Sequence, residues 1–325
     1  MSRSRLVPPL HLRRPAVGLA ATLVLLTAAC SAGGYAATPV PTPTTPQAPA
    51  PAASSTPAGN GCPPPSTNLT SYAPLPPGAT PDLPTFPNNR LRVGVSADTL
   101  LLGARNPVTT QIEGFDIDLA RAVAKAALGS EDKIQLVVIT AADRVPFLTS
   151  GKVDMVARNM SMTCGRWADI AFSAEYYQAG LKLLVAKGQT ASFAALKGKR
   201  VCAPTGTSTL TFVQKQSGVT AVGARDHTSC LVLFQAGKVD AIAGDDTVLA
   251  GLAAQDPYAS VPKQPVLTSE PYGLGFSQKD RGLVRLANRV IDDLKSGPGW
   301  KQLYDKWFAG PLGAAATPPS SVYGR

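Results

Sequence analysis

The chain has 325 residues, enough for two ordinary domains, and its 44% hydrophobic content can supply a buried core. These values exclude a collagen-like chain and a wholly disordered one. Two histidines and five cysteines are too few for a multi-histidine metal site or a small disulfide-stapled fold. The net charge of +10 arises without a dense run of lysine and arginine, so no nucleic-acid partner is expected.

The first thirty residues have the pattern of a bacterial export signal. Four arginines within the first 14 residues precede an apolar stretch, residues 16–29, that is too short to span a membrane as a mature helix. Small residues then precede Cys30, which resembles the cleavage site of a lipoprotein signal. We therefore predict that residues 1–29 are a signal peptide and that Cys30 carries a lipid anchor. The alternative is an ordinary secretory signal in which Cys30 is incidental.

Residues 30–88 are predicted to form a disordered spacer. They consist mostly of Pro, Ala, Thr, Ser and Gly, and Asp82 is the only charged residue between residues 31 and 89. Such a composition buries too little apolar surface to fold and favours a semi-extended chain. The spacer would hold a folded domain away from a membrane. A flexible tail of similar composition is expected at residues 313–325.

Strands and helices are predicted to alternate between these segments. Residues 91–95 form a short apolar strand, and residues 134–139 form the next. A helix opens between them at Phe115, because Ile117 and the alanines that follow recur at helical spacing. This rhythm indicates an α/β fold with doubly wound parallel sheets and right-handed crossovers.

Two eight-residue stretches repeat each other: residues 147–154 read FLTSGKVD, and residues 233–240 read LFQAGKVD. Each is predicted to contain a helix end, a glycine cap and the start of a strand. The repeat favours two similar lobes, although two neighbouring units of one sheet would also produce it. Asn159 and Asp245 follow the two glycines at equal distance, at strand ends where open α/β sheets bind ligands. Capping the loops is the alternative role for both side chains.

Further polar groups lie near these strand ends. Residues 159–166 combine an amide, hydroxyls and the guanidinium of Arg166, which suits bidentate capture of a carboxylate. A predicted strand at residues 199–203 leads through a Gly-Thr-Ser turn into a helix, and backbone N–H groups there, with Ser208 beside them, favour an anion. Together with the acid Asp245, this set matches the carboxylate and ammonium of an α-amino acid. A surface position for Arg166 is the alternative.

Several runs resemble the polar-amino-acid solute-binding proteins of ABC importers, and within them the actinobacterial glutamine/glutamate-binding lipoproteins. The runs are GFDIDLA at 114–120, MSMTCGR at 160–166, IAFS at 170–173, YY at 176–177 and GKRVC at 198–202. The resemblance covers about residues 89–312. It implies the type II periplasmic-binding-protein fold, in which two α/β lobes are joined by two crossover strands and close on the ligand by hinge motion.

The resemblance also implies the limits of the two lobes. Lobe 1 would comprise residues 89–183 and 275–312, and lobe 2 would comprise residues 184–274. The crossovers would fall near residues 182–186 and 272–276. The helix at residues 300–308 would return to pack on lobe 1.

The resemblance further implies roles for the polar residues. Arg166 would bind the α-carboxylate of the ligand, helped by Ser161 and Ser208, and Asp245 would bind the α-ammonium. The family normally has an aspartate at the end of the first binding strand, whereas this chain has Ser96 there, with Asp98 two residues on.

Two other arginines predict the side chain of the ligand. Arg158 stands where the family often has a small hydroxyl residue, and Arg105 follows the first strand. A buried cation without a partner is costly, so glutamate or aspartate is predicted over glutamine. If both arginines instead face solvent or pair with Glu113 or Asp98, the pocket would accept an amide or even a basic side chain, which keeps glutamine as the runner-up. The predicted ligand-binding residues are Arg166, Asp245, Ser161, Asn159, Ser208, Thr207, Arg158 and Arg105.

The cysteines match an oxidising compartment. With Cys30 lipidated, the remaining four allow three pairings. We favour Cys202–Cys230, because a strand end and an early helix position of lobe 2 would meet, and Cys62–Cys164 by remainder. No two cysteines have chelating spacing, so neither a metal nor a cofactor is expected.

The leading interpretation is a monomeric lipoprotein at the extracytoplasmic face of the cell membrane that delivers an amino acid to the permease subunits of an ABC importer. An amino-acid sensor that signals to a membrane partner and a kinase is one alternative, since the spacer would serve either. A dehydratase or cell-wall enzyme on the same fold is another. Catalysis requires a general acid at the reacting centre, and Asp245 would be committed to the ligand ammonium, so no enzyme is predicted.

Overall fold

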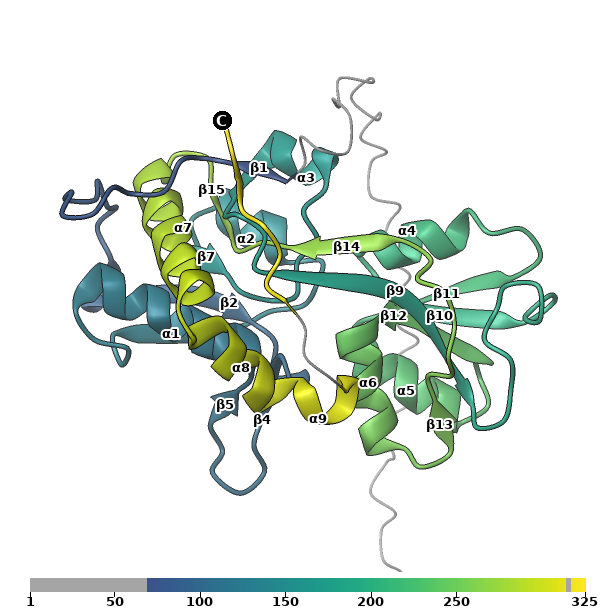
Figure 1. Ribbon diagram of the computed structural model, residues 1–325. Coiled ribbons are helices and arrows are strands. Elements are labelled where there is room, and N and C mark those ends of the chain that lie inside the picture. The colour runs from purple at the N-terminus through teal and green to yellow at the C-terminus, as the bar shows by residue number, and fades with distance from the viewer. Residues whose placement is uncertain (1–68, 314–316) are drawn as a thin grey trace, which may run out of the picture. The chain divides into compact units, whose positions relative to one another are not determined.

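The computed structural model of this protein describes residues 69–313 and 317–325 (Figure 1). The predicted signal peptide, Cys30, Cys62 and most of the predicted spacer lie outside the described residues. Within the described part, no helix combines the length and the apolar run that crossing a membrane requires.

Lobe 1 is built on a five-stranded mixed sheet of order β6-β2-β7-β15-β8, covered by helices. Its strands are β2 (Leu91–Val95), β6 (Ile134–Val138), β7 (Met155–Val156), β8 (Ile170–Phe172) and β15 (Gly275–Ser277). Its helices are α1 (Phe115–Leu128), α2 (Arg144–Thr149), α3 (Cys164–Asp169), α7 (Arg281–Ser296), α8 (Gly299–Trp307), α9 (Ala309–Leu312) and the short 3-10 turn η2 (Pro87–Asn89). Three short strands form a separate small sheet: β3 (Asp98–Thr99), β4 (Gly103–Arg105) and β5 (Ile112–Glu113).

Lobe 2 repeats this plan with the order β11-β10-β12-β9-β13. Its strands are β9 (Tyr177–Ala186), β10 (Arg200–Pro204), β11 (Thr220–Ala224), β12 (Ala241–Asp245), β13 (Ala259–Ser260) and β14 (Ser269–Tyr272), which pairs with β9. Its helices are α4 (Ser208–Gln214), α5 (His227–Gln235) and α6 (Asp246–Gln255). β2 in lobe 1 and β10 in lobe 2 each lie between two parallel neighbours, as the βαβ rhythm predicts.

The repeated sequence has the same structure in both lobes. The glycine of each copy is left-handed, with φ of 69° and 64°, a conformation that a side chain disfavours. The aspartate that ends each copy binds an arginine of the neighbouring strand: Arg92 Nε lies 3.1 Å from Asp154, and Arg200 Nε lies 3.0 Å from Asp240. The repeat therefore marks two equivalent lobes, not two units of a single sheet.

Two antiparallel strands carry the chain between the lobes. β14 pairs with the first residues of β9, so that Tyr272 lies opposite Tyr177. From residue 181 onward β9 runs along β12 inside the lobe 2 sheet. The first crossing thus begins earlier than the expected residues 182–186, because one continuous strand serves as both crossover and sheet strand. The returning helix α8 packs on lobe 1, where Trp300 contacts Phe115.

Both ends of the described chain differ from the expectation of a disordered spacer to residue 88 and a flexible tail from residue 313. Ser71 is fully buried, and Tyr72, Leu75 and Phe86 pack against the core of lobe 1. β1 (Thr70–Ser71) pairs in parallel with β16 (Val322–Tyr323). Scattered apolar side chains cannot build a core of their own, but each can bury its surface on a core that the rest of the chain supplies.

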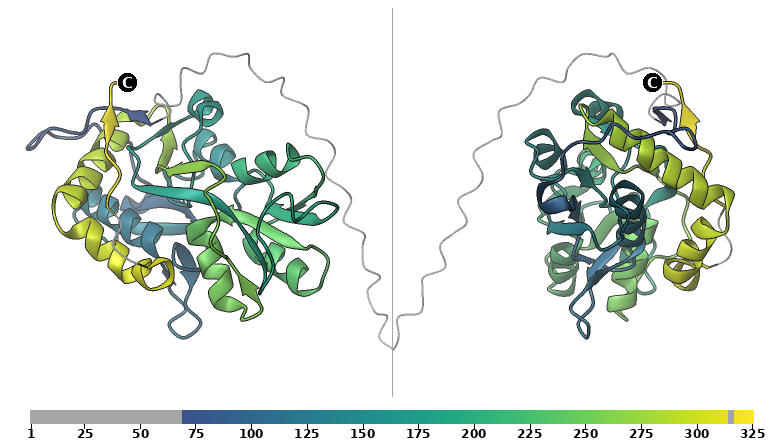
Figure 2. Two further views of the ribbon diagram at one scale, coloured as in Figure 1. Left: turned by 45° about the vertical axis from the view of Figure 1, so that its right-hand side comes forward. Right: turned by 90° about the vertical axis from the view of Figure 1, so that its left-hand side faces the viewer.

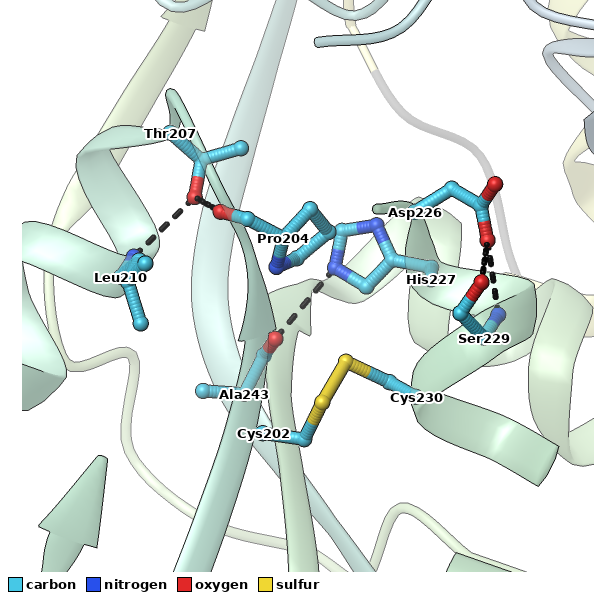
Figure 3. The surroundings of a disulfide bond; sticks show 9 residues. All are labelled: Cys202, Pro204, Thr207, Leu210, Asp226, His227, Ser229, Cys230 and Ala243. Atoms are coloured by element: carbon cyan, nitrogen blue, oxygen red, sulfur yellow. Dashed lines mark hydrogen bonds between the residues drawn. A yellow bond between two sulfur atoms is a disulfide. The ribbon is translucent and has the colours of Figure 1, made fainter. Parts of the chain in front are cut away.

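The predicted Cys202–Cys230 disulfide is confirmed, and it joins β10 to α5 (Figure 3). Asp226 caps α5 by accepting hydrogen bonds from the Ser229 N–H and hydroxyl. Cys164 is also disulfide-bonded. Its predicted partner, Cys62, lies outside the described residues.

Candidate functional site

Side chains of the two lobes meet beside the crossover strands, at the carboxyl ends of β7 and β10. Parallel strands of an open α/β sheet bring their carboxyl ends to one edge, which is where such sheets bind ligands. Arg166 Nη2 of lobe 1 lies 3.4 Å from the carbonyl oxygen of Gly206 in lobe 2. Ser208 Oγ lies 3.5 Å from Ser161 Oγ. Arg166 and Ser161 of lobe 1 therefore face Gly206 and Ser208 of lobe 2, and we call this meeting place of the two lobes the cleft.

Arg166 is the cation of this cleft on the lobe 1 side. It lies in α3, where the Thr163 side chain accepts the backbone N–H of Arg166 and caps the helix. Its Nη1 donates to the carbonyl oxygen of Ser161 at 2.6 Å. Burial lowers the pKa of Arg166, while Glu270 and Asp245 raise it. Its hydrogen bonds go to backbone carbonyls, so the carboxylates of Glu270 and Asp245 act on its charge through space.

Asp245 is the matching acid on the lobe 2 side. It ends β12 and is 6% exposed. Its Oδ2 accepts a hydrogen bond from the Tyr272 hydroxyl at 2.6 Å, whereas its buried Oδ1 has no hydrogen-bond partner. Burial, followed by the nearby charge of Glu270, raises the pKa of Asp245 to about 7. A buried acceptor without a donor is unfavourable, and a ligand ammonium would satisfy it.

Glu270 is a second buried acid in the cleft, and the sequence reasoning missed it. It lies in β14 and is 5% exposed. Its carboxylate accepts hydrogen bonds from Thr268 at 2.7 Å and from Ser208 at 3.1 Å. The predicted crossover at residues 272–276 was the signal that could have identified Glu270. Crossover strands border the cleft, and Glu270 lies just before that segment.

Arg144 is a second buried cation that the sequence reasoning missed. It is 3% exposed, and its Nη2 donates to the carbonyl oxygen of Gly206 at 3.2 Å, which adds another contact between the lobes. Its Nε donates to Ala141 O at 2.9 Å. Burial lowers its pKa, as do the nearby charges of Arg166 and Arg158. Its position shortly after a predicted strand was the signal that could have identified it.

Asn159 lies at the cleft with a buried side-chain oxygen, Oδ1, that has no hydrogen-bond partner. Its backbone is left-handed, with φ of 34°. The Asn159 N–H donates to Asp116 at 2.7 Å, and the Tyr176 hydroxyl donates to the same carboxylate at 2.7 Å. Burial raises the pKa of Asp116 to about 6, although both of these donors lower it. Asp116, near the start of α1, thus holds the Asn159 turn in place.

The structure does not bring Thr207 and Arg105 into this group as ligand contacts. Thr207 caps α4: its Oγ1 accepts the Leu210 N–H at 3.1 Å and donates to Pro204 O at 2.6 Å. Arg105 is exposed on the β4–β5 hairpin, where its Nη1 donates to Thr110 O at 2.6 Å. The hairpin bends back on itself, so the nearest acceptor for Arg105 is a carbonyl of its own loop.

Arg158 is buried as predicted, at 6% exposed, but it is not without partners. Its Nε donates to Ile139 O at 2.9 Å. The carboxylates of Asp98, Asp226 and Asp143 lie near enough to oppose the lowering of its pKa that burial causes. The premise of an uncompensated buried cation therefore does not hold.

A cavity of about 250 Å³ opens beside Arg158, with walls from both lobes. Its lining residues are Ala97, Asp98, Val138, Ile139, Thr140, Asp143, Arg158, Arg225 and Asp226. A larger hollow of about 960 Å³ lies on lobe 2 alone and contains none of the predicted ligand-binding residues. Binding sites combine a hollow with convergent polar groups, and of these two hollows only the smaller contains a predicted ligand-binding residue, Arg158, so the cleft between the lobes is the candidate site.

Comparison with known proteins shows the family to which the chain is similar. The bacterial extracellular solute-binding proteins, family 3, match residues 91–310 of the chain. The ABC transporter glutamine-binding protein GlnH of Bacillus subtilis is 33% identical over 224 residues, which cover 68% of this chain and 82% of that protein. The glutamine-binding protein of Geobacillus stearothermophilus is 34% identical over 199 residues, covering 60% and 76%. The crystal structure of the P235GK mutant of ArgBP from T. maritima superposes with a TM-score of 0.64 at 30% identity, covering 69% of this chain and 96% of that one.

Proposed function

This chain belongs to the bacterial extracellular solute-binding proteins of family 3, and from that premise we propose that it holds an L-α-amino acid between Arg166 and Asp245. It is a polar-amino-acid-binding protein of the ABC-transporter type and not an enzyme. Its fold is the type II periplasmic-binding-protein fold. Closure of the two lobes about the crossover strands would enclose the ligand for delivery to a permease.

The observation that carries this proposal is the hydrogen bonding of one acid and one cation in the cleft. Asp245 Oδ1 is buried without a donor, and Arg166 is bonded to backbone carbonyls. The ammonium of an amino acid supplies the missing donor, and its carboxylate supplies the partner for the guanidinium. The hydroxyls of Ser161 and Ser208 lie beside the carboxylate position, and Asn159 Oδ1 offers a further acceptor for the ammonium.

For the side chain of the ligand, we propose a carboxamide or a carboxylate, with glutamine ahead of glutamate and aspartate. The prediction of an acidic ligand depended on a buried arginine without a partner. Three carboxylates and two arginines line the cavity at Arg158, which leaves it short of positive charge for another carboxylate. The two relatives described above are glutamine-binding proteins by name. Both considerations favour a neutral side chain.

A calorimetric competition series tests this ranking with L-glutamine, L-glutamate, L-aspartate, L-asparagine and L-arginine. We expect glutamine to bind most tightly, and Arg158→Ala to weaken it without reversing its order relative to glutamate. Arg105→Ala is the matched control, since Arg105 is an exposed arginine of the same lobe. If glutamate binds wild type more tightly than glutamine, and Arg158→Ala removes that preference, the ligand is acidic and the original prediction holds.

We also propose that the protein is anchored in the cell membrane through a lipid on Cys30. A diacylglyceryl cysteine with a further acyl chain is a stable anchor, because two or more chains suffice. Cys30→Ala is expected to release the protein into the medium, whereas Ser31→Ala is expected to leave it in the membrane fraction. Retention of the Cys30→Ala protein after an alkaline wash would show that another feature holds it.

A further inference from the structure

Two described segments, residues 69–90 and 317–325, lie outside residues 91–310 that match the family. Parts of both meet as the parallel pair β1–β16, in which Thr70 lies opposite Val322 and Ser71 lies opposite Tyr323 (Figure 2). We call residues 70–72 and 321–325 the terminal clamp. Because these segments lie outside the family match, membership of the family does not explain why they pack on lobe 1.

The terminal clamp is firmly bonded to helix α7 of lobe 1. Asn288 is fully buried, and its Nδ2 donates to Ser71 Oγ at 2.9 Å. Asp292 accepts hydrogen bonds from the hydroxyls of Ser321 and Tyr323, each at 2.7 Å. Both strands of the clamp are therefore fixed to the same helix, and the clamp moves with lobe 1.

Each of the two segments of the clamp also places one side chain against Trp167. The ring of Tyr72 lies edge-on to Trp167 with 6.5 Å between ring centroids. The guanidinium of Arg325 lies over the Trp167 ring, 3.9 Å from its centroid. On another side, Phe172 packs against the same indole at 5.3 Å. Trp167 directly follows Arg166, the cation of the cleft, in the chain.

The helix that carries both residues depends on such contacts. α3 has only six residues, and a helix of that length is not stable by itself. Its position is therefore set by tertiary contacts, among them those of Trp167. A shift of about 1 Å at a binding group can weaken its interaction substantially, and the distances from Arg166 to Ser161 and Gly206 leave little room for such a shift.

We propose that the terminal clamp is a positioning device for the ligand site: it holds Trp167, and through Trp167 it orients α3 so that the Arg166 guanidinium faces the cleft. This inference rests on the proposed function of Arg166. Residues 70–72 of the clamp also lie between the predicted anchor, Cys30, and the ligand site along the chain. Ligand affinity then depends on residues far outside the cleft.

The test is a double-mutant cycle on the full chain, with L-glutamine and L-glutamate as probes. Arg325→Ala is expected to weaken binding roughly three- to tenfold, because it removes the cation–π contact with Trp167 and the hydrogen bond from Nε to Thr70 O. Arg325→Lys, which keeps a cation over the indole, is expected to restore most of the affinity. Because Arg325 acts through Arg166, its substitution is expected to have no further effect in an Arg166→Ala background measured at millimolar ligand. Deletion of residues 321–325 serves as a second variant, with at least as large an effect as Arg325→Ala.

Arg289→Ala is the matched control, since Arg289 is an arginine of α7 that pairs with Asp293 and not with the clamp. The clamp proposal is overturned if Arg325→Ala and the deletion bind as wild type does, or if Arg325→Ala weakens binding equally in both backgrounds. The latter result would indicate general loosening of lobe 1. Failure of the proposed function looks different, because Arg166→Ala alone would then bind both amino acids as wild type does.

Discussion

Arg166→Ala is expected to weaken amino-acid binding by roughly 30-fold to several thousand-fold, since truncating one member of a buried charge pair typically costs about 2–5 kcal/mol. The substitution leaves the ligand carboxylate buried without its cation. Calorimetric titration with L-glutamine and L-glutamate measures the loss. Arg121→Ala is the matched control, because Arg121 is an arginine of lobe 1 whose acidic partner, Asp132, is exposed.

Arg166→Lys separates charge from geometry. A lysine keeps the charge but loses the planar fork that binds a carboxylate through two parallel hydrogen bonds. We therefore expect an affinity between those of wild type and Arg166→Ala. Unchanged amino-acid affinity in Arg166→Ala would place the ligand elsewhere and remove the basis of the proposed site.

Asp245→Asn is expected to weaken binding roughly ten- to hundredfold, because the ligand ammonium loses a charge-assisted hydrogen bond. An amide oxygen can still accept a hydrogen bond, so the loss should be smaller than for Arg166→Ala. Asp246→Asn is the matched control. Asp246 is the next residue, and its Oδ2 lies 3.8 Å from Lys182 Nζ, with which it forms an ion pair. Equal affinities for wild type and Asp245→Asn would show that the ammonium binds to another acceptor.

The pH dependence of binding provides a second readout of Asp245. Burial and Glu270 raise the pKa of its carboxyl to about 7, and the ammonium binds only the ionised form. Protons therefore compete with the ligand. Affinity should be highest above pH 7 and fall as the pH drops below it, by up to about tenfold per pH unit. Titrations from pH 5 to pH 8 should show this slope in wild type and, displaced to lower pH, in Asp246→Asn, because the charge of Asp246 also raises the pKa of Asp245; Asp245→Asn should not show it. The same slope in Asp245→Asn would assign the proton to another group.

Local patterns in the sequence were sufficient to predict the alternating strands and helices, whereas the two-lobed fold with crossover strands was implied by the family resemblance. The apolar strands, the helix that begins at Phe115 and the two glycine-capped repeats depend on neighbours close in the chain, and the structure confirms them. The repeats also located the strand ends, and with them Asp245. These features are predictable because strand alternation, helical spacing and glycine caps are set by the backbone within a few residues.

The cleft was only partly predictable for the opposite reason. Glu270 approaches Ser208 across 62 positions of the chain, and Arg144 reaches Gly206 across the same separation. No local pattern in the sequence indicates which distant polar groups will bond to each other. The same holds for Arg158, whose burial was predicted but whose surrounding carboxylates come from separate loops of both lobes.

The terminal segments show most clearly what the sequence by itself determined and what the tertiary structure decided. Composition predicted a disordered spacer to residue 88 and a flexible tail from residue 313, whereas parts of both segments pack on lobe 1. Whether such a segment packs depends on the surface that the folded lobes present. Here Ser71 is buried, and Tyr72 and Arg325 contact Trp167 of lobe 1. Secondary structure follows from short-range backbone preferences, whereas the pairing of charges and the docking of chain ends follow from surfaces that exist only after the lobes have folded.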